Sequence, residues 1–329
     1  MTLRIGALGA ASILEAALVK PAKAVPEVEV FAVAARDPAR ARAYAEQKQI
    51  PRVHDTYEAL LADRDVDAVY IPLPNSHHAR WTIAALDAGK HVLCEKPFAA
   101  NTAEAELVAD AAARTDLVVM EAFHWRYHPL AQRAREIIAS GELGRVLNIE
   151  ASMCFPLFKR GDIRWRYDLA GGALMDAGCY PVHMVRHLLA EEPAVVSAEA
   201  KLRAPDVDRA MRIELAFPSG ARGRVMASMW SSSVLKLGIR VEGDQGWLRI
   251  FNPVAPSSFH RFTISTVEGK RRERVPGDTT YVHQLRAFAD AVLDGAPTLT
   301  PPSDSVANMR VIDAAYRAAG LPLRVGAAS

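Results

Sequence analysis

"RIGALGAASILEAAL", residues 4–18, decides the fold of this chain. An apolar run leads through Gly6 to Gly9, small residues follow, and a segment with helical periodicity comes next. Backbone N–H groups at the start of a helix, together with the helix dipole, attract a diphosphate, and small side chains let it come close. The stretch predicts a strand, a tight turn and a helix that bind a dinucleotide, although Ala11 stands where the usual fingerprint has its second glycine. We expect cofactor contacts at Gly9, Ala11, Ser12 and Ile13.

From residue 3 to about residue 121, short apolar runs alternate with longer helical segments. A repeat of strand and helix produces a parallel sheet that is covered on both faces. The runs are almost entirely apolar, as burial on both faces requires. We therefore predict a doubly wound Rossmann domain over residues 1–122, with strands at 3–8, 28–35, 66–73, 91–95 and 117–122.

The pattern changes after residue 122, where a second domain for substrate binding and dimerisation, residues 123–329, is expected to begin. Many strands follow in which apolar and polar residues alternate, as at 235–242, and this period is typical of an antiparallel sheet. The predicted fold class is α/β: a Rossmann domain followed by an α+β domain with a large, mostly antiparallel open sheet. Helices of the second domain are expected at about 129–140, 173–190, 280–294 and 304–319.

Composition excludes several classes of function. A formal net charge of +2 gives no field that would select nucleic acid or a membrane surface. The three cysteines, Cys94, Cys154 and Cys179, are widely spaced and form no Cys-x-x-Cys pattern, which favours a reducing cytoplasm. Small and polar residues interrupt the apolar N-terminus, so we expect no signal peptide. No apolar stretch approaches the roughly 18 residues of a membrane span.

The end of the second predicted strand discriminates between the two nicotinamide cofactors. NAD enzymes place an acidic side chain there to hold the ribose hydroxyls, whereas this chain has Arg36. An arginine can pair with the 2′-phosphate of NADP through two hydrogen bonds and stack on the adenine. We therefore favour NADP(H) over NAD(H). Asp37, one residue further on, leaves NAD open as the alternative.

Five stretches carry a resemblance to a known family. They are "GALGAASI" (6–13), "IPLPNSHH" (71–78), "CEKP" (94–97), "EAFHWRYHP" (121–129) and "GGALMDAGCYPVH" (171–183). In this order and spacing the chain resembles, over essentially its whole length, the glucose–fructose oxidoreductase, inositol dehydrogenase and MocA family (Gfo/Idh/MocA). Many members have histidine at the position of Tyr180. With a tyrosine at this position, the chain resembles the branch that contains dimeric dihydrodiol dehydrogenase and NADP-dependent D-xylose dehydrogenase.

The resemblance implies that Lys96 lies over the nicotinamide, beside the substrate carbon that exchanges hydride, and that Glu95 orients the site. Physical reasoning agrees, because ligands bind outside the carboxyl ends of parallel strands and a cation there stabilises a neighbouring anion. A cis Lys96–Pro97 bond is a reasonable hypothesis. The implied cofactor contacts are Arg36, Pro74, Asn75, His78, Glu95, Lys96, Trp125 and Arg126.

Residues 173–190 supply the second half of the predicted site. On a helix, Asp176 and Tyr180 are four residues apart and face the same way, and His183 follows on that face. The resemblance implies that Tyr180 moves the hydroxyl proton. Since a free phenol has a pKa of about 10, Lys96 is expected to stabilise the phenolate. The expected catalytic residues are Lys96, Asp176 and Tyr180, and the expected substrate contacts are Lys96, Trp125, Arg164, Asp176, Tyr180 and His183.

We therefore expect an NADP-dependent dehydrogenase or reductase that acts on a hydroxyl of a sugar, cyclic polyol or dihydrodiol. The alternative is a dinucleotide-binding sensor without turnover, although a sensor would need neither Lys96 nor Tyr180. No metal is expected, because Asp176 and His183 are too few ligands. Apolar residues on one strand, Met211 to Phe217, are expected to form an open face that a second copy covers, giving a homodimer or a dimer of dimers.

Overall fold

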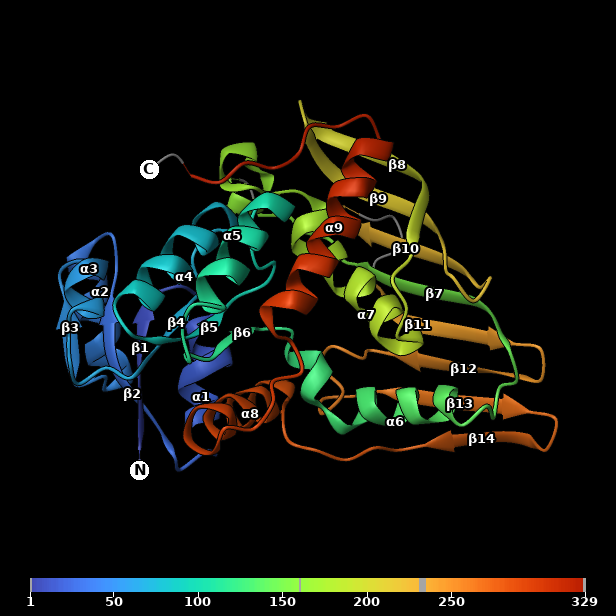
Figure 1. Cartoon of the computed structure of the whole chain (residues 1–329), viewed down its shortest axis with the longest axis horizontal. Helices are drawn as coiled ribbons and strands as arrows, with labels where there is room; N and C mark the ends of the chain where they lie inside the picture. Colours follow the sequence, from blue (N-terminus) through green and yellow to red (C-terminus); the bar gives the residue numbers. More distant parts are fainter. Residues whose placement is uncertain (1, 160, 231–234, 328–329) are drawn as a thin grey trace. The chain divides into compact units, whose positions relative to one another are not determined.

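The structure is a computed structural model that describes residues 2–159, 161–230 and 235–327 (Figure 1). The chain forms two compact units. Unit 1 contains residues 1–124, 281–306 and 327–329, and unit 2 contains residues 125–280 and 307–326. Residues 281–306, which the sequence analysis assigns to the second domain, therefore belong to unit 1. The expected division after residue 122 stays a prediction.

The sheet of unit 1 has six parallel strands in the order β3-β2-β1-β4-β5-β6. The predicted Rossmann sheet is confirmed, and a short edge strand, β3, is added to it. The strands are β1 (Leu3–Leu8), β2 (Val28–Ala34), β3 (Arg52–His54), β4 (Ala68–Ile71), β5 (His91–Cys94) and β6 (Val119–Glu121). The helices are α1 (Lys20–Ala22), α2 (Pro38–Lys48), α3 (Tyr57–Leu61), α4 (His78–Asp87), α5 (Thr102–Ala112) and α8 (Thr280–Asp294).

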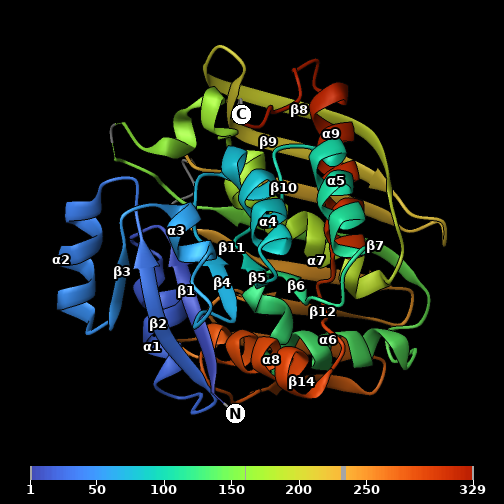
Figure 2. The ribbon, with the colours of Figure 1, turned by 60° about the vertical axis from the view of Figure 1, so that its left-hand side comes forward.

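Capping side chains determine where several of these helices begin. The Asp37 carboxylate accepts backbone N–H bonds at the start of α2, and Thr56 does the same for α3. The Asn101 side chain accepts a bond from the Glu104 N–H at 3.0 Å and caps α5 in the same way. Figure 2 shows α4 and α5 side by side over the β4–β6 half of the sheet.

The strand order of unit 1 reverses at β1, because β2 and β4 lie on opposite sides of it. At such a point the loops that follow neighbouring strands diverge and leave a crevice outside the carboxyl ends, where ligands of α/β sheets bind. Gly9 follows β1 and Leu73 follows β4. A Cβ atom added at Gly9 would lie 3.3 Å from Leu73 Cδ2, so the turn needs a small residue here.

Unit 2 is built on an eight-stranded sheet in the order β14-β13-β12-β11-β7-β10-β9-β8. Only β7 and β10 pair in parallel, so the predicted large, mostly antiparallel sheet is confirmed. The strands are β7 (Val146–Cys154), β8 (Ala194–Ala204), β9 (Val207–Ala216), β10 (Arg222–Ser228), β11 (Lys236–Gly243), β12 (Gly246–Phe251), β13 (Arg261–Thr266) and β14 (Gly269–Glu273).

One face of this sheet is covered by helices of the same chain: α6 (Pro129–Ala139), α7 (Cys179–Leu189) and α9 (Pro302–Ala318). The expectation that the apolar side of β9 is open is wrong, because Met211, Ile213, Leu215 and Phe217 are buried. α7 and the turn before it pack against β7, β9 and β10. The approach is close: a Cβ atom added at Gly178 would lie 3.0 Å from Ala227 Cβ.

The opposite face of the sheet, which we call the outer face, is charged. Arg224 donates to Glu214 at 2.9 Å and to Glu150 at 3.0 Å across three strands. At the β12–β14 end there is a hollow of about 360 Å³, lined by Trp247, Arg249, Phe251, Phe259, Arg261, Thr263, Lys270 and Arg272. Within the described ranges, none of the helices is both long and apolar enough to cross a membrane.

Candidate functional site

The turn after β1 has the backbone geometry that a dinucleotide site requires. Gly9 has φ +128°, which favours glycine, and its N–H donates to the Ala34 carbonyl at 2.7 Å. Arg40 Nη2 donates to the Ala10 carbonyl at 2.7 Å and holds the turn from outside. Ser12 is exposed, and the helix that follows begins as a π-helical turn, Glu15–Val19. The small residues and the free approach to the turn fit a bound diphosphate.

The two residues after β2 have different environments. Arg36 is exposed. Asp37 Oδ1 accepts bonds from Ala39 N–H at 3.0 Å and Arg40 N–H at 3.4 Å, so this carboxylate is engaged as the cap of α2. Arg42 donates to Asp55 at 2.9 Å on the surface. Arg36 is therefore the charged side chain at this strand end that makes no hydrogen bond or ion pair with the described residues.

Lys96 follows the carboxyl end of β5, and its peptide bond to Pro97 is cis. The carboxyl group of Glu95 beside it is buried. It accepts a hydrogen bond from Tyr70 Oη at 2.7 Å and one from the Lys96 backbone N–H at 3.3 Å. Burial raises the pKa of Glu95, and the positive charge of Lys96 opposes this effect. The crevice of unit 1 thus contains one ammonium group next to a buried, hydrogen-bonded carboxyl.

His78 is buried and connects two loops of this crevice. Its Nδ1 lies 2.7 Å from the Pro97 carbonyl, and its Nε2 lies 2.7 Å from the Leu73 carbonyl. Two carbonyls favour the protonated ring, but burial and the charge of Lys96 prevail and lower the pKa of His78 to about 4. Pro74 precedes the 3-10 turn Asn75–His77, and Asn75 is buried. His78 therefore fixes the loop that carries Pro74 and Asn75, which are also predicted to contact the cofactor.

Two residues near Lys96 are absent from the sequence prediction. The rings of His124 and Tyr281 lie 4.1 Å apart, centroid to centroid. Burial and the charge of Lys96 lower the pKa of His124 to about 3, and burial and the charge of Glu95 raise the pKa of Tyr281. His124 lies three residues after the end of β6, and its closeness to the carboxyl end of a strand could have identified it. Tyr281 is on α8, far away in the sequence, and has no local signal.

In unit 2 the predicted helix 173–190 begins differently from expectation. Leu174–Gly178 form a π-helical turn, and regular α-helix begins at Cys179. Asp176 lies in the π-helical turn and Tyr180 in the first turn of α7. Arg164 Nε lies 3.9 Å from Asp176 Oδ1, so the structure brings these two predicted substrate residues together. π-Helical turns within helices are frequent at functional sites.

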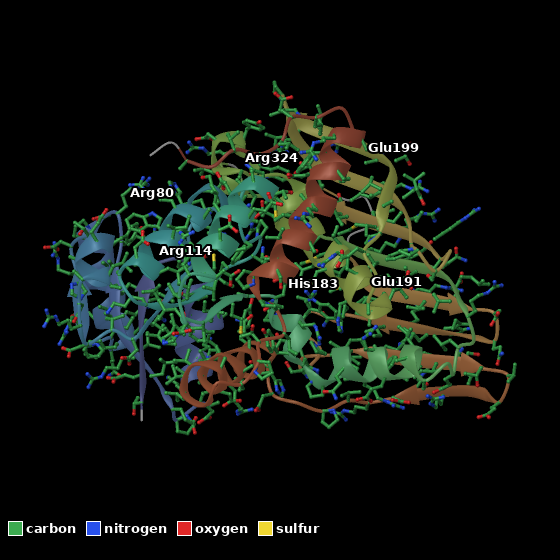
Figure 3. All side chains as sticks on the ribbon, in the orientation of Figure 1. Arg80, Arg114, His183, Glu191, Glu199 and Arg324 are labelled. Atoms are coloured by element: carbon green, nitrogen blue, oxygen red, sulfur yellow. The ribbon has the colours of Figure 1, made fainter. Side chains whose placement is uncertain are left out.

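Trp125 and His183 also meet in unit 2. Trp125 Nε1–H donates to His183 Nδ1 at 3.2 Å, and both side chains are buried. Figure 3 labels His183 on α7. Because an indole only donates, Nδ1 of His183 has to be unprotonated, and a neutral ring then carries its proton on Nε2. Arg126, half-buried, is next to Trp125 in the 3-10 turn His124–Tyr127. The predicted roles of all these residues stay predictions.

A buried ion pair holds the start of the π-helical turn. Asp208 Oδ2 accepts the Leu174 N–H at 2.7 Å, and Oδ1 accepts bonds from Tyr316 Oη at 3.0 Å and from Arg324 Nη2 at 2.8 Å. Arg324 Nε donates to the Gly171 carbonyl at 2.8 Å. Arg324 and Asp208 are completely buried, and Figure 3 labels Arg324. The pair links β9, the C-terminal segment and the segment that carries Asp176.

The same pair explains the two glycines of the "GGALMD" motif. A Cβ atom at Gly172, whose φ is +140°, would lie 2.2 Å from Asp208 Oδ1. A Cβ atom at Gly171 would lie 2.5 Å from the Arg164 carbonyl. Both distances are too short for any side chain. The glycines therefore allow the ion pair and the Arg164 loop to approach the backbone.

No cluster of three or more His, Cys, Asp or Glu side chains suited to a metal ion occurs in the part of the chain that the structure describes.

Comparison with known proteins gives consistent results for both units. A sequence profile described as an oxidoreductase family with an NAD-binding Rossmann fold matches residues 3–123, and one described as the GFO/IDH/MocA C-terminal domain matches residues 131–249. The D-xylose 1-dehydrogenase (NADP(+)) 2 of Haloferax volcanii is 40% identical over 318 residues, which are 95% of this chain and 96% of that protein.

Two further proteins are similar. The trans-1,2-dihydrobenzene-1,2-diol dehydrogenase of Bos taurus is 34% identical over 231 residues, which are 69% of this chain and 67% of that protein. A 3-ketoreductase from Actinomadura kijaniata, solved in complex with NADP and TDP-benzene, has a TM-score of 0.89 at 30% identity, covering 97% of this chain and 98% of the other.

We expect Arg324→Met to lower the free energy of unfolding by about 3–5 kcal/mol, because it leaves the Asp208 carboxylate buried without its cation. Urea denaturation at neutral pH measures the change. The matched control is Arg240→Met, which removes an exposed ion pair with Glu242 and should cause no measurable loss. A loss below about 1 kcal/mol for Arg324→Met would contradict a structural role of the pair.

Proposed function

Because the chain belongs to the Gfo/Idh/MocA family of oxidoreductases, we propose that Lys96 and Tyr180 handle the proton while hydride passes between NADP(H) and a hydroxyl-bearing carbon. The protein is an NAD(P)-dependent oxidoreductase that acts on CH–OH groups of sugar-related compounds. The substrate we propose is a sugar, a cyclic polyol or a dihydrodiol. The observation that carries the proposal is the place of Lys96, at the carboxyl end of β5 and beside buried Glu95.

The cofactor is NADP(H) in preference to NAD(H). Of the relatives named above, the D-xylose dehydrogenase is NADP-dependent by name and the 3-ketoreductase was solved with NADP. The chain's own residues agree, since Arg36 is exposed at the end of β2 while the Asp37 carboxylate is engaged in capping α2. Arg36 would pair with the 2′-phosphate, and the turn from Gly9 to Ile13 would hold the diphosphate. Pro74, Asn75, Trp125 and Arg126 are the further contacts we propose.

The proposed mechanism assigns each residue one task. When bound, NADP(H) would supply the hydride acceptor or the hydride donor of the reaction. Tyr180 takes the hydroxyl proton as the carbon–oxygen double bond forms. The ammonium group of Lys96 donates to the substrate oxygen and stabilises the phenolate. Asp176, oriented by Arg164, and the Nε2–H of His183 would bind the remaining hydroxyl groups.

A non-catalytic dinucleotide sensor of the same fold is not favoured. The similar proteins are enzymes by name, and the chain retains both Lys96 and Tyr180, for which a sensor has no use.

We expect Lys96→Ala and Tyr180→Phe each to lower kcat by about 100- to 10,000-fold, the range that a positioned acid or base contributes. NADPH binding, followed by fluorescence, should change little for Tyr180→Phe. Matched controls are Lys23→Ala, at an exposed lysine, and Tyr44→Phe, at a half-buried tyrosine whose hydroxyl has no hydrogen-bond partner among the described residues. A Tyr180→Phe enzyme that keeps more than a third of the wild-type kcat would refute the proton role.

Arg36→Ala should raise the KM for NADPH by about 10- to 100-fold and leave the KM for NADH nearly unchanged, because only NADPH carries the 2′-phosphate. Initial rates with both cofactors at saturating substrate measure this ratio. Arg42→Ala, which removes an arginine already bonded to Asp55, is the control. Equal effects on the two cofactors would mean that Arg36 does not read the phosphate.

We also propose a homodimer, or a dimer of dimers, that forms through the outer face of the unit 2 sheet. Because the apolar side of β9 is buried, the proposal of a dimer rests on the hollow at the β12–β14 end, where Phe259 is exposed. Four cationic side chains line the hollow: Arg249, Arg261, Lys270 and Arg272. None of them forms an ion pair with a carboxylate of the described residues.

If two such faces meet, their like charges repel, and salt should screen the repulsion. We therefore expect the dimer fraction in sedimentation velocity at micromolar concentration to rise between about 50 and 500 mM NaCl. Arg249→Gln should remove part of this salt dependence. A monomer at both salt concentrations would contradict the proposal.

A further inference from the structure

A row of aromatic and arginine side chains begins at Asp176 in unit 2. Arg164 lies next to Asp176, and Trp165 is its neighbour in the 3-10 turn Ile163–Trp165. The guanidinium carbon of Arg203 lies 4.6 Å from the Trp165 ring centroid and 5.6 Å from that of Trp230. The Trp230 ring in turn lies 5.8 Å from the Phe158 ring. We call Phe158, Trp165, Arg203 and Trp230 the aromatic strip.

The outer end of the strip is unusually exposed. Phe158 is 74% exposed and Trp230 is 44% exposed. Exposed rings that form a continuous patch next to a candidate site indicate a binding surface more often than chance exposure. The two rings meet edge to face, with an angle of 72° between their planes. A flat ligand could therefore lie on one ring and contact the edge of the other.

The strip is held in place by the fold. Beyond β7, the Phe155 N–H donates to the Ser228 carbonyl at 2.9 Å and the Leu157 N–H to the Met229 carbonyl at 2.8 Å. These bonds fix the backbone that leads into each of the two exposed rings, and the Trp230 N–H donates to Ser228 Oγ at 3.2 Å. At the inner end, Trp165 packs against a buried cluster that includes Ala173 and Ala177. The fold therefore holds the inner end of the aromatic strip and the approach to its outer rings, which lowers the cost of binding.

Arg203 supplies charge at the middle of the strip. It lies over two rings, and no carboxylate of the described residues is in ion-pair range of it. A guanidinium stacked on aromatic rings keeps its N–H groups directed outward in one plane, the arrangement that binds phosphate through two hydrogen bonds. Arg164, between Asp176 and Trp165, offers a second guanidinium, with 42% of its side chain exposed.

We propose that the aromatic strip binds the distal part of the substrate, and that this part is a nucleoside diphosphate linked to the sugar. The inference rests on the proposed function, since it places the reacting sugar at Asp176. The order of groups along the strip matches such a compound. The carboxylate of Asp176 binds sugar hydroxyls, Arg164 and Arg203 bind the diphosphate, and the rings of Trp230 and Phe158 stack on the base. A free sugar would use only the first of these groups.

The test begins with two non-reacting probes, UDP and dTDP, titrated calorimetrically into the wild-type protein saturated with NADP⁺. We expect saturable binding with one site per chain. Trp230→Ala and Phe158→Ala should each weaken it by about 5- to 100-fold, the range for loss of one base-stacking ring. Arg203→Met should weaken it by about 10- to 100-fold. Phe259→Ala, at an exposed aromatic ring of the outer face, is the matched control and should not change it.

Steady-state kinetics then compare a UDP-linked sugar, the corresponding sugar 1-phosphate, its 4-nitrophenyl glycoside and the free sugar. We expect the ratio of kcat/KM for the UDP-linked over the free sugar to exceed 100 in the wild type and to fall at least tenfold in Trp230→Ala and Arg203→Met. A preference for the aryl glycoside alone would show that the rings bind an uncharged group, and would overturn the nucleotide.

The results separate this inference from the proposed function. If neither nucleotide binds at 1 mM, or if the variants change only the oligomeric state, the inference fails while the effects of Lys96→Ala and Tyr180→Phe can still stand. If UDP binds and the strip variants weaken it, but no sugar derivative is turned over, the strip is supported and the proposed reaction fails.

Discussion

The buried ion pair between Asp208 and Arg324 fixes the part of unit 2 that carries the candidate site. With no exposure to water, the Asp208 carboxylate accepts bonds from a backbone N–H, a tyrosine hydroxyl and an arginine. A buried charge is tolerated only when its hydrogen bonds are complete. The donors come from residue 174 and from residues 316–324, both far in the chain from Asp208, so the bonds form only when these three segments have folded together. The position of the π-helical turn with Asp176 is thereby fixed by the fold and not by local preference.

In unit 1, burial acts on the ionisable side chains around the crevice. The parallel sheet supplies a crevice at the carboxyl ends of β1, β4 and β5, and side chains there are buried although several are ionisable. Burial keeps the rings of His78 and His124 neutral at physiological pH. Lys96 therefore lies near two neutral imidazoles and the buried carboxyl of Glu95. A cation in such a setting acts strongly on an anion that develops nearby, because water screens it less.

The parts of the fold that could be predicted are those with strong local periodicity. The apolar runs of β1, β2, β4 and β5 are long enough to predict a parallel sheet, whereas β3, a three-residue edge strand, has no such run. The alternation on β9 correctly predicted a strand with one apolar face. It could not tell whether that face is covered by α7 or by a second copy, because both would bury the same residues.

The candidate site, too, could be predicted only where the sequence has a local signal. Roles for motif residues such as Lys96 and Tyr180 could be predicted from the sequence, because their neighbours in the chain carry the motif, and these roles stay predictions. Tyr281, Asp208 and Arg324 were missed, since each acts through contacts more than one hundred residues away in the chain. At the aromatic strip, the sequence predicts only the neighbouring Arg164, because Arg203 and Trp230 come from β8 and from the segment after β10.

The π-helical turn at Leu174–Gly178 has a consequence for the history of this sequence. Such a turn contains one residue more than an α-helix needs to cover the same length. Removing one residue between Asp176 and Tyr180 would restore a regular helix and rotate everything before it by about 100° relative to α7. An evolutionary loss of that length could therefore change the direction of the Asp176 carboxylate relative to α7 while both residues are retained, and homologous chains should differ here by substitution far more readily than by deletion.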